Sequence, residues 1–358
     1  MDVFFNLLIV NFKQGLLYGV LALGVYITYS ILDFPDLSVD GTVPLGGVVS
    51  AILILKGVNP WLALLAAFAA GAAAGCVTGL LHVKLRIRPL LCGILVMTAL
   101  LSVNLMIIKA GTGGMSIVSF FQASTVLNTA PVALIPEYVG GYTLRPLVLM
   151  LVMAFVCKFL LDWYLRTKSG MLLRATGSNS QYVVQLARNP GISKILGLAL
   201  GNGFAGLAGA LITQDKGSAD LQFGTGMVVT GLASVIIGVS LLRKVRFLRD
   251  TSKVLIGSLL YMTFLTIADA MNLSDQLKLI MAALFVAALV ASNILDKGRG
   301  SVRDSVSYTH LVKASIPVAA VSPLGMEAIM SGSTTATTGI SWVSTQTNLR
   351  FFSTSVMT

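Results

Sequence analysis

Apolar segments of nearly membrane-spanning length alternate with short polar loops along the first 295 residues. A helix that crosses a bilayer needs about 20 predominantly apolar residues. The segments that approach this length are residues 16–32, 61–81, 90–108, 146–165, 195–212, 227–242, 254–270 and 277–295. A short apolar stretch, residues 3–12, precedes them, and residues 43–55 are too few for an ordinary span. The pattern predicts an all-α, polytopic transmembrane helix bundle with about eight or nine spans, including a broken helix.

The composition supports a membrane protein. Of the 358 residues, 56% are hydrophobic and only 11% are charged, and the mean hydropathy is +0.87. A soluble domain with so few charges would lack a polar surface, whereas a chain surrounded by lipid does not need one. The sequence near Met1 has neither the basic start nor the small-residue site of a cleavable signal peptide, so we expect the first helix to be retained.

Basic residues collect in alternate loops, which indicates the orientation of the chain. The net charge of +11 does not point to a nucleic acid partner, because the Lys and Arg residues lie between apolar spans. Excess Lys and Arg marks the cytoplasmic side. We therefore expect the loops around Arg86, Lys168, Arg246 and Lys297 to be cytoplasmic. The side of Met1 stays open, because it depends on whether residues 43–55 cross the bilayer.

The last 61 residues differ in kind from the rest. Residues 298–358 are rich in Ser and Thr, and their one mildly apolar stretch, residues 311–321, is too short to cross a bilayer. We expect residues 1–297 to form the transmembrane domain and residues 298–358 to be a tail that is disordered or foreign to the fold.

An acidic segment interrupts the apolar pattern near the first span. Residues 33–47 contain Asp33, Asp36 and Asp40 together with Pro35 and Pro44. Proline removes a helix donor, so a continuous helix is not expected here. Broken helices at membrane depth occur where backbone lines a cavity, often at a transport site. The alternative is an extracellular turn with solvated acids, and the residues alone favour neither interpretation.

The longest basic loop, residues 166–194, carries a second candidate site. Ser178 and Gln181 have the spacing of a capping box, which predicts a short amphipathic helix over residues 181–188, stopped by Pro190 and Gly191. Such a helix in a cytoplasmic loop is typical of an element that docks on a partner protein. The alternative is a helix that rests on the lipid interface.

The remaining motifs point away from catalysis and cofactors. Gly201–Gly206 formally matches GxGxxG, but no strand precedes it, and small residues at four-residue spacing instead predict close helix packing in lipid. No GxxxxGK[ST] motif is present, so we expect no nucleotide site. We also expect no metal, no cofactor and no catalytic residue, and the three cysteines, Cys76, Cys92 and Cys157, are expected to be free thiols.

Several segments resemble the permease family of branched-chain amino acid and simple-sugar ABC importers, most closely its branch for tryptophan or other aromatic amino acids. The resemblance covers about the first 295 residues and omits the tail. The segments that carry it are residues 17–24 (LYGVLALG), 36–41 (DLSVDG), 174–179 (RATGSN), 195–200 (ILGLAL) and 231–238 (GLASVIIG). This chain departs from the family pattern at Ala187, where the family usually has Gly, near Ser180 and Gln181, where an acidic residue is frequent, and at Val239, where the nearest branch commonly has Glu.

The resemblance implies roles for both candidate sites. It places a broken helix near the translocation path, whose residues are Asp36, Leu37, Ser38, Val39, Asp40 and Gly41. It also implies that the loop of residues 177–191 docks on an ATPase subunit. The docking residues are Gly177, Ser178, Asn179, Gln181, Val184, Leu186, Ala187 and Gly191.

The implied assembly is a permease homodimer in the bacterial plasma (inner) membrane, multi-pass and surrounded by lipid. Two ATP-binding cassette subunits would drive it, and an extracytoplasmic solute-binding protein would supply a small polar solute. An amino acid is the favoured solute, and a sugar or nucleoside is the alternative. A self-powered, ion-coupled secondary transporter is a further alternative, which the near absence of ionisable residues within the spans disfavours.

Overall fold

The computed structural model describes residues 2–270, apart from 114–116, 122, 130–131, 133–137, 140–141, 144, 243–244 and 246. These residues belong to one compact unit, Met1–Leu289. The expected span at residues 277–295, the loop around Lys297 and the tail of residues 298–358 lie outside the described residues, as does Arg246.

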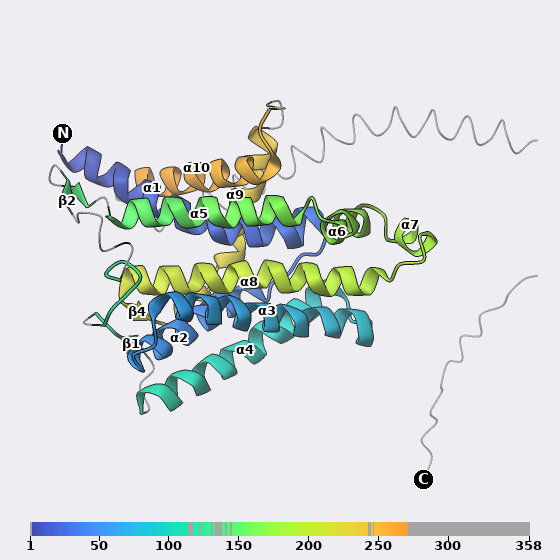
Figure 1. The fold of residues 1–358 in the computed structure, drawn as a ribbon, viewed down its shortest axis with the longest axis horizontal. Coiled ribbons are helices and arrows are strands. Elements are labelled where there is room, and N and C mark those ends of the chain that lie inside the picture. Colours follow the sequence, from blue (N-terminus) through green and yellow to red (C-terminus); the bar gives the residue numbers. More distant parts are fainter. Residues whose placement is uncertain are drawn as a thin grey trace, which may run out of the picture. The chain divides into compact units, whose positions relative to one another are not determined.

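The described residues form an all-α bundle with four two-residue strands in its loops, which confirms the expected fold class (Figure 1). Its helices are α1 (Asp2–Val25), α2 (Val39–Leu55), α3 (Pro60–Leu85), α4 (Pro89–Thr112), α5 (Arg145–Tyr164), α6 (Lys168–Ser178), α7 (Ser180–Gln185), α8 (Pro190–Lys216), α9 (Met227–Leu241) and α10 (Asp250–Ala270). A π-helix, η1 (Tyr26–Ile31), continues α1, and a 3-10 turn, η3 (Gln222–Gly224), precedes α9. The strands are β1 (Val118–Ser119), β2 (Tyr138–Val139), β3 (Tyr142–Thr143) and β4 (Ser218–Ala219), paired antiparallel as β1 with β4 and β2 with β3.

Six of the expected spans are recovered, the expected span at residues 254–270 lies within α10, which is not among these six, and two short apolar segments differ from expectation. Six helices of the described chain are long and apolar enough to cross a membrane: Leu8–Ile31, Pro60–Leu85, Pro89–Thr112, Arg145–Tyr164, Pro190–Lys216 and Gln222–Leu241. The separate apolar stretch expected at residues 3–12 is instead the first part of α1. Residues 43–55 belong to a longer helix, α2, which has 17 residues and still falls short of an ordinary span.

Three helices begin at a proline, which explains one wrong prediction. Pro60, Pro89 and Pro190 each occupy the first turn, where the missing N–H costs nothing. Pro190 therefore starts α8 and does not terminate the helix before it. The side chain of Asn189 caps this start, because its Oδ1 accepts a hydrogen bond of 2.8 Å from Gly191 N.

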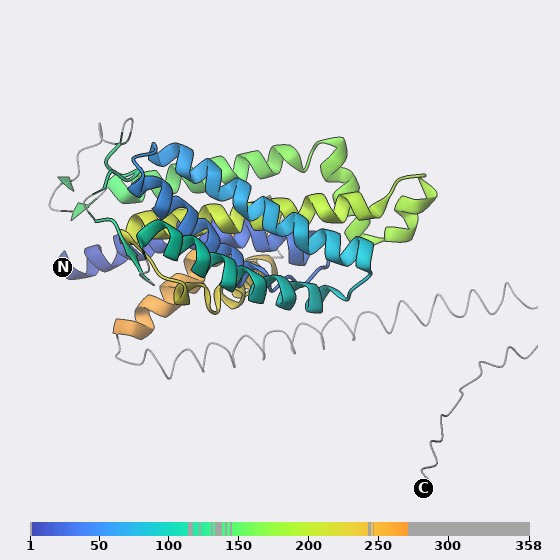
Figure 2. The same ribbon diagram turned by 90° about the horizontal axis from the view of Figure 1, so that it is seen from below.

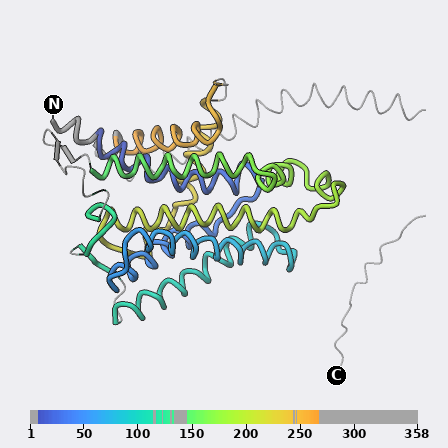
Figure 3. Tube along the Cα trace, in the orientation of Figure 1, coloured from blue at the N-terminus to red at the C-terminus, as the bar shows by residue number. Residues whose placement is uncertain are grey.

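Helix α8 lies at the centre of the bundle, against α1, α2 and α3 (Figures 1 and 3). Its small residues allow this approach. A Cβ at Gly206 would lie 2.6 Å from the backbone oxygen of Ala67 on α3, and one at Gly201 would meet Thr28 Cγ2 at 2.6 Å. The packing interpretation of the GxGxxG match is therefore confirmed.

The short helices α6 and α7 lie at one end of the bundle, and β1, β2 and β4 lie at the other (Figures 1 and 2). The side chain of Lys13 on α1 forms an ion pair of 2.8 Å with Asp215, near the end of α8. Helix α8 runs from the basic loop, next to α6 and α7, to the opposite end of the bundle, where Asp215 lies. Because Lys13 contacts Asp215 there, α1 begins at the end away from α6 and α7. If basic loops are cytoplasmic, α1 begins on the outer face.

This orientation predicts a labelling pattern. In a variant that lacks the native cysteines, Lys56→Cys, in the exposed turn between α2 and α3, should react with a membrane-impermeant thiol reagent added to intact cells. Arg86→Cys and Lys168→Cys, which are also exposed, should react only after permeabilisation. Labelling of Arg86→Cys or Lys168→Cys in intact cells would contradict the orientation.

Candidate functional site

The acidic segment is a true interruption between two helices. After η1 the backbone is non-helical over residues 33–36, and Asp33 adopts a φ of +53°, which is unusual for a residue with a side chain. Helical bonding resumes with α2, whose start includes hydrogen bonds from Gly41 N and Thr42 N to Ser38 O. This break, residues 33–36, therefore includes Pro35, as expected. The expectation that the helix is interrupted over residues 33–47 is wrong for the part from Val39 onward, including Gly41, which is helical.

Asn202 of α8 forms hydrogen bonds with residues at the break and at the start of α2. Its Nδ2 donates to Asp36 Oδ2 at 2.7 Å, and its Oδ1 lies 3.2 Å from Ser38 Oγ and 2.8 Å from Thr42 Oγ1. The other oxygen of Asp36 accepts from Ser38 N at 2.9 Å. Asn202 and Ser38 are fully buried, and Asp36 is only 6% exposed. A buried carboxylate without such partners would be costly, so this network fixes where the chain turns from η1 into α2.

Asp40 has a different structural role from Asp36. Its carboxylate accepts hydrogen bonds from Val228 N at 2.7 Å and Gly226 N at 3.3 Å, at the start of α9. The N-cap residue of α9 is Gly226, whose φ is +84° and which has no side chain to cap the helix. Asp40 supplies that cap from α2, and its negative charge suits the positive end of the α9 dipole.

A small cavity lies beside this cap. It has a volume of about 100 Å³, and Asp40, Gly41 and Asn104 are among its lining residues. Asn104 of α4 donates from Nδ2 to Gly41 O at 3.1 Å, whereas its buried Oδ1 has no partner among the described residues. Asp40 and Gly41 thus border a space with an available acceptor, which a water molecule can fill.

The predicted path residues separate into two groups in the structure. Asp36, Ser38 and Val39 are buried against neighbouring helices, while Leu37 and Asp40 are half-buried. Sequence reasoning missed Thr42, Asn104 and Asn202 as partners of this segment. The sequence did contain a signal for them: an Asn within an apolar span is costly unless it is paired, so Asn104 and Asn202 each needed a polar partner.

The predicted docking loop contains two helices, α6 and α7, where one was expected. The cap of α7 is Asn179, whose Oδ1 accepts from Gln181 N at 3.0 Å and Tyr182 N at 3.2 Å. Ser178 belongs to the last turn of α6, where its Oγ lies 3.1 Å from Arg174 O. The predicted capping box of Ser178 and Gln181 is therefore wrong, and α7 ends at Gln185.

Helix α7 buries one apolar side chain and exposes the others. Val183 is fully buried, whereas Tyr182, Val184 and Leu186 are each more than half exposed. The adjacent Ala187 has a φ of +53°, a left-handed conformation that glycine adopts at no steric cost. This backbone suits the glycine that the family resemblance implies at this position.

Close packing joins this loop to the break. A Cβ at Gly177 of α6 would collide with Ile31 O at the end of η1 and lie 3.0 Å from Leu32 Cα. Only glycine allows α6 to rest on the chain directly before the break. Gly191 packs instead on Val83 of α3, where an added Cβ would lie 2.6 Å from Val83 Cγ1.

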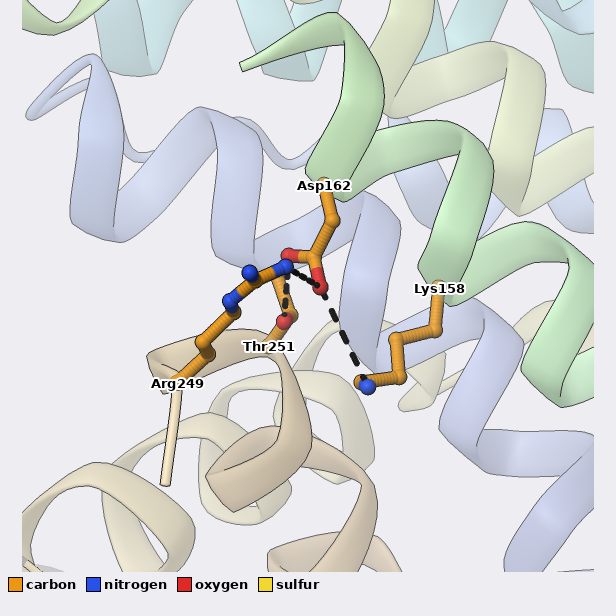
Figure 4. A network of polar contacts seen from close by, with 4 residues as sticks. All are labelled: Lys158, Asp162, Arg249 and Thr251. Carbon is orange, nitrogen blue, oxygen red and sulfur yellow. Dashed lines mark hydrogen bonds and ion pairs between the residues drawn. The ribbon is translucent and has the colours of Figure 1, made fainter. Parts of the chain in front are cut away.

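A charged network ties α5 to the start of α10 (Figure 4). Asp162 of α5 accepts from Thr251 Oγ1 at 2.7 Å and from Arg249 Nη1 at 3.1 Å, and Lys158 Nζ lies 3.9 Å away. Asp162 is 7% exposed, so these partners offset the cost of its burial.

The described part of the chain offers no metal site. Within it, no three His, Cys, Asp or Glu residues are grouped so that they could hold a metal ion. The three cysteines are free thiols.

The network around Asn202 predicts a large stability cost when its amide is removed. Asn202→Leu keeps a similar volume but removes the amide donor of the Asp36 carboxylate and the acceptor of Thr42 Oγ1, so the free energy of unfolding should fall by about 3 kcal/mol. The measurement is reversible denaturation of the detergent-solubilised chain. Thr213→Val is a matched control on the same helix, because the buried Oγ1 of Thr213 has no partner within the described structure. Its cost should be below about 1 kcal/mol, and equal losses in the two variants would contradict the role of Asn202.

Comparisons with known proteins agree with this architecture. The family model described as the permease component of the branched-chain amino acid transport system matches residues 8–295. A tyrosine transport system permease protein of Clostridioides difficile (strain R20291) is 40% identical over 282 residues, which cover 78% of this chain and 90% of that protein. An autoinducer 2 import system permease protein of Salmonella choleraesuis (strain SC-B67) is 30% identical over 236 residues, 66% of this chain and 62% of that protein.

Other relatives are less informative about the solute. An uncharacterized protein of Rickettsia prowazekii (strain Madrid E) is 32% identical over 289 residues, 79% of this chain and 97% of that protein. No solved structure matches the chain. The family match covers most of the chain and the bundle has the apolar helices of a multi-pass inner-membrane protein, so the chain belongs to the family of branched-chain amino acid transport permeases of ABC importers.

Proposed function

We propose that this permease subunit imports an aromatic amino acid, with tyrosine favoured. The observation that carries the proposal is the 40% identity to a tyrosine transport permease along 90% of that protein. A sugar-like solute is the second candidate, because relatives named for autoinducer 2 and fructose import are 30% and 23% identical. The subunit would act as a homodimer with two ATP-binding subunits and an extracytoplasmic solute-binding protein.

The proposed solute predicts the outcome of an uptake assay. Cells that produce the permease with its ATPase and binding protein should accumulate radiolabelled tyrosine, tryptophan or phenylalanine more than leucine, fructose or uridine. A matched strain without the permease gives the background. Uptake confined to fructose or uridine would refute an amino acid function while leaving the family assignment intact.

The break is the proposed hinge on the translocation path. Residues 36–41 would lie near the moving solute, because Asp40 and Gly41 already border a cavity beside α4 and the segment that precedes α9. Asp40 joins α2 to α9, and Asp36 joins the break to α8. A change in the angle of α2 would therefore be transmitted to both helices, as alternating access requires.

Helices α6 and α7 are the proposed coupling element. Val184 and Leu186 would seat in a groove of the ATPase, and movement of α6 would pass through Gly177 to Ile31 and then to the break. Support comes from the exposed apolar side chains on α7 and from the close contact at Gly177. Exposed apolar groups at the tip of a cytoplasmic loop gain free energy when a partner buries them.

The coupling proposal predicts a loss of ATPase binding. In the double variant Val184→Glu and Leu186→Glu, the affinity for the ATPase subunit should fall at least about 30-fold, the effect of losing roughly 2 kcal/mol. Co-purification and stimulated ATP hydrolysis measure it. Leu55→Glu is the control, since Leu55 is 46% exposed at the other end of the bundle. Normal binding and hydrolysis in the double variant would refute docking through α7 and favour a helix that rests on lipid.

A further inference from the structure

A polar cavity of about 470 Å³ lies at the end of the bundle that carries α6 and α7. Its volume falls within the range of about 300–1,000 Å³ that is usual for small-molecule sites. Four lining residues are cationic, Arg166, Arg174, Arg249 and Lys253, and two are carboxylates, Asp162 and Asp250. The cavity is therefore net positive, and α5, α6 and α10 all contribute to it.

The carboxylates of the cavity already have cationic partners. Asp162 accepts hydrogen bonds from Arg249 and Thr251 (Figure 4), and Asp250 accepts one from Lys253 Nζ at 2.9 Å. Within the described structure, no hydrogen bond or ion pair reaches the guanidinium groups of Arg166 and Arg174. Two arginines thus face one cavity with their donors available, a geometry that suits an anion such as phosphate.

The surroundings place this cavity at the level of lipid headgroups. Trp163, next to Asp162 at the end of α5, is 69% exposed, and Phe247, just before the lining residue Leu248, is 97% exposed. Exposed aromatic residues at the ends of spans are typical of the membrane–water interface. The basic loops place this interface on the cytoplasmic side, where anionic lipids attract juxtamembrane basic residues.

We infer that this cavity binds the phosphate group of an anionic phospholipid headgroup from the cytoplasmic leaflet. The headgroup phosphate accepts from Arg166 and Arg174, and the acyl chains remain in the bilayer near Phe247. Because Arg174 lies on α6 and Arg249 and Lys253 lie near the start of α10, a bound phosphate joins these helices next to the proposed coupling loop. The inference is independent of which solute the permease carries.

The test is a lipid titration of the full-length permease followed by native mass spectrometry. The wild type should retain phosphatidylglycerol in preference to chain-matched phosphatidylcholine, and the affinity should weaken as salt is added. Arg166→Gln and Arg174→Gln should each lower the affinity about tenfold, the loss expected when one charge-assisted hydrogen bond to the phosphate is removed. Lys168→Gln is the control, because Lys168 has the same charge in the same exposed loop but does not line the cavity. The affinity of Lys168→Gln for phosphatidylglycerol should equal that of the wild type.

Four results would overturn the inference. Equal retention of the two lipids in the wild type would show that the headgroup charge is not recognised. An equal loss of phosphatidylglycerol affinity in Lys168→Gln would show that only the overall charge of the surface matters. Inorganic phosphate is titrated in parallel, and arginine-dependent binding of phosphate without binding of phosphatidylglycerol would assign the cavity to a soluble anion. If the arginine variants lost the ATPase subunit but kept the lipid, the cavity would be a protein contact. Two separate arginine variants guard against a single misfolded one, and gel filtration monitors both.

Discussion

The hydrogen bonds between Asn202 and the segment around Asp36 are the interaction on which the rest of the structure depends. An apolar bundle offers little to stabilise a buried carboxylate, yet the chain must leave its helical path between η1 and α2. Asn202 resolves both problems, because its amide donates to Asp36 while its carbonyl lies beside the hydroxyls of Ser38 and Thr42. Small residues along α8 bring α2 and α3 close enough for this network to form.

The break would be of little use if it were isolated, and residues on both sides of it contact other helices. Before it, α6 packs on Ile31 and Leu32 through Gly177. After it, Asp40 caps α9 from the side of α2. A continuous set of packed contacts therefore runs from the predicted docking loop to the cavity near Asp40. Such a chain of rigid elements around one irregular segment is the physical form that the proposed coupling would take.

Charge is concentrated at one end of the bundle and serves two purposes there. Paired groups, such as Asp162 with Arg249, hold helix ends together where the backbone leaves the membrane. Arg166 and Arg174, for which the described part of the chain provides no hydrogen-bond or ion-pair partner, line the cavity proposed to bind an anionic headgroup. The apolar side chains exposed on α7 lie beside this charged region in sequence, so the proposed docking element and the proposed anion site would be neighbours.

The sequence by itself determined the membrane class, most of the spans, the interruption at Pro35 and the exposed apolar face that includes Val184 and Leu186. These features follow from local composition, because the lengths of apolar segments and the positions of prolines act within one element.

Tertiary structure alone decided which polar groups pair with one another. Asp36 and Asn202 are 166 residues apart, and nothing in the local pattern pairs them. The same holds for the cap that Asp40 provides for α9 and for the side on which α1 begins, which depends on the contact between Lys13 and Asp215. Buried polar groups must find partners wherever the fold brings them, so their roles are fixed by packing between distant elements and not by the sequence around them.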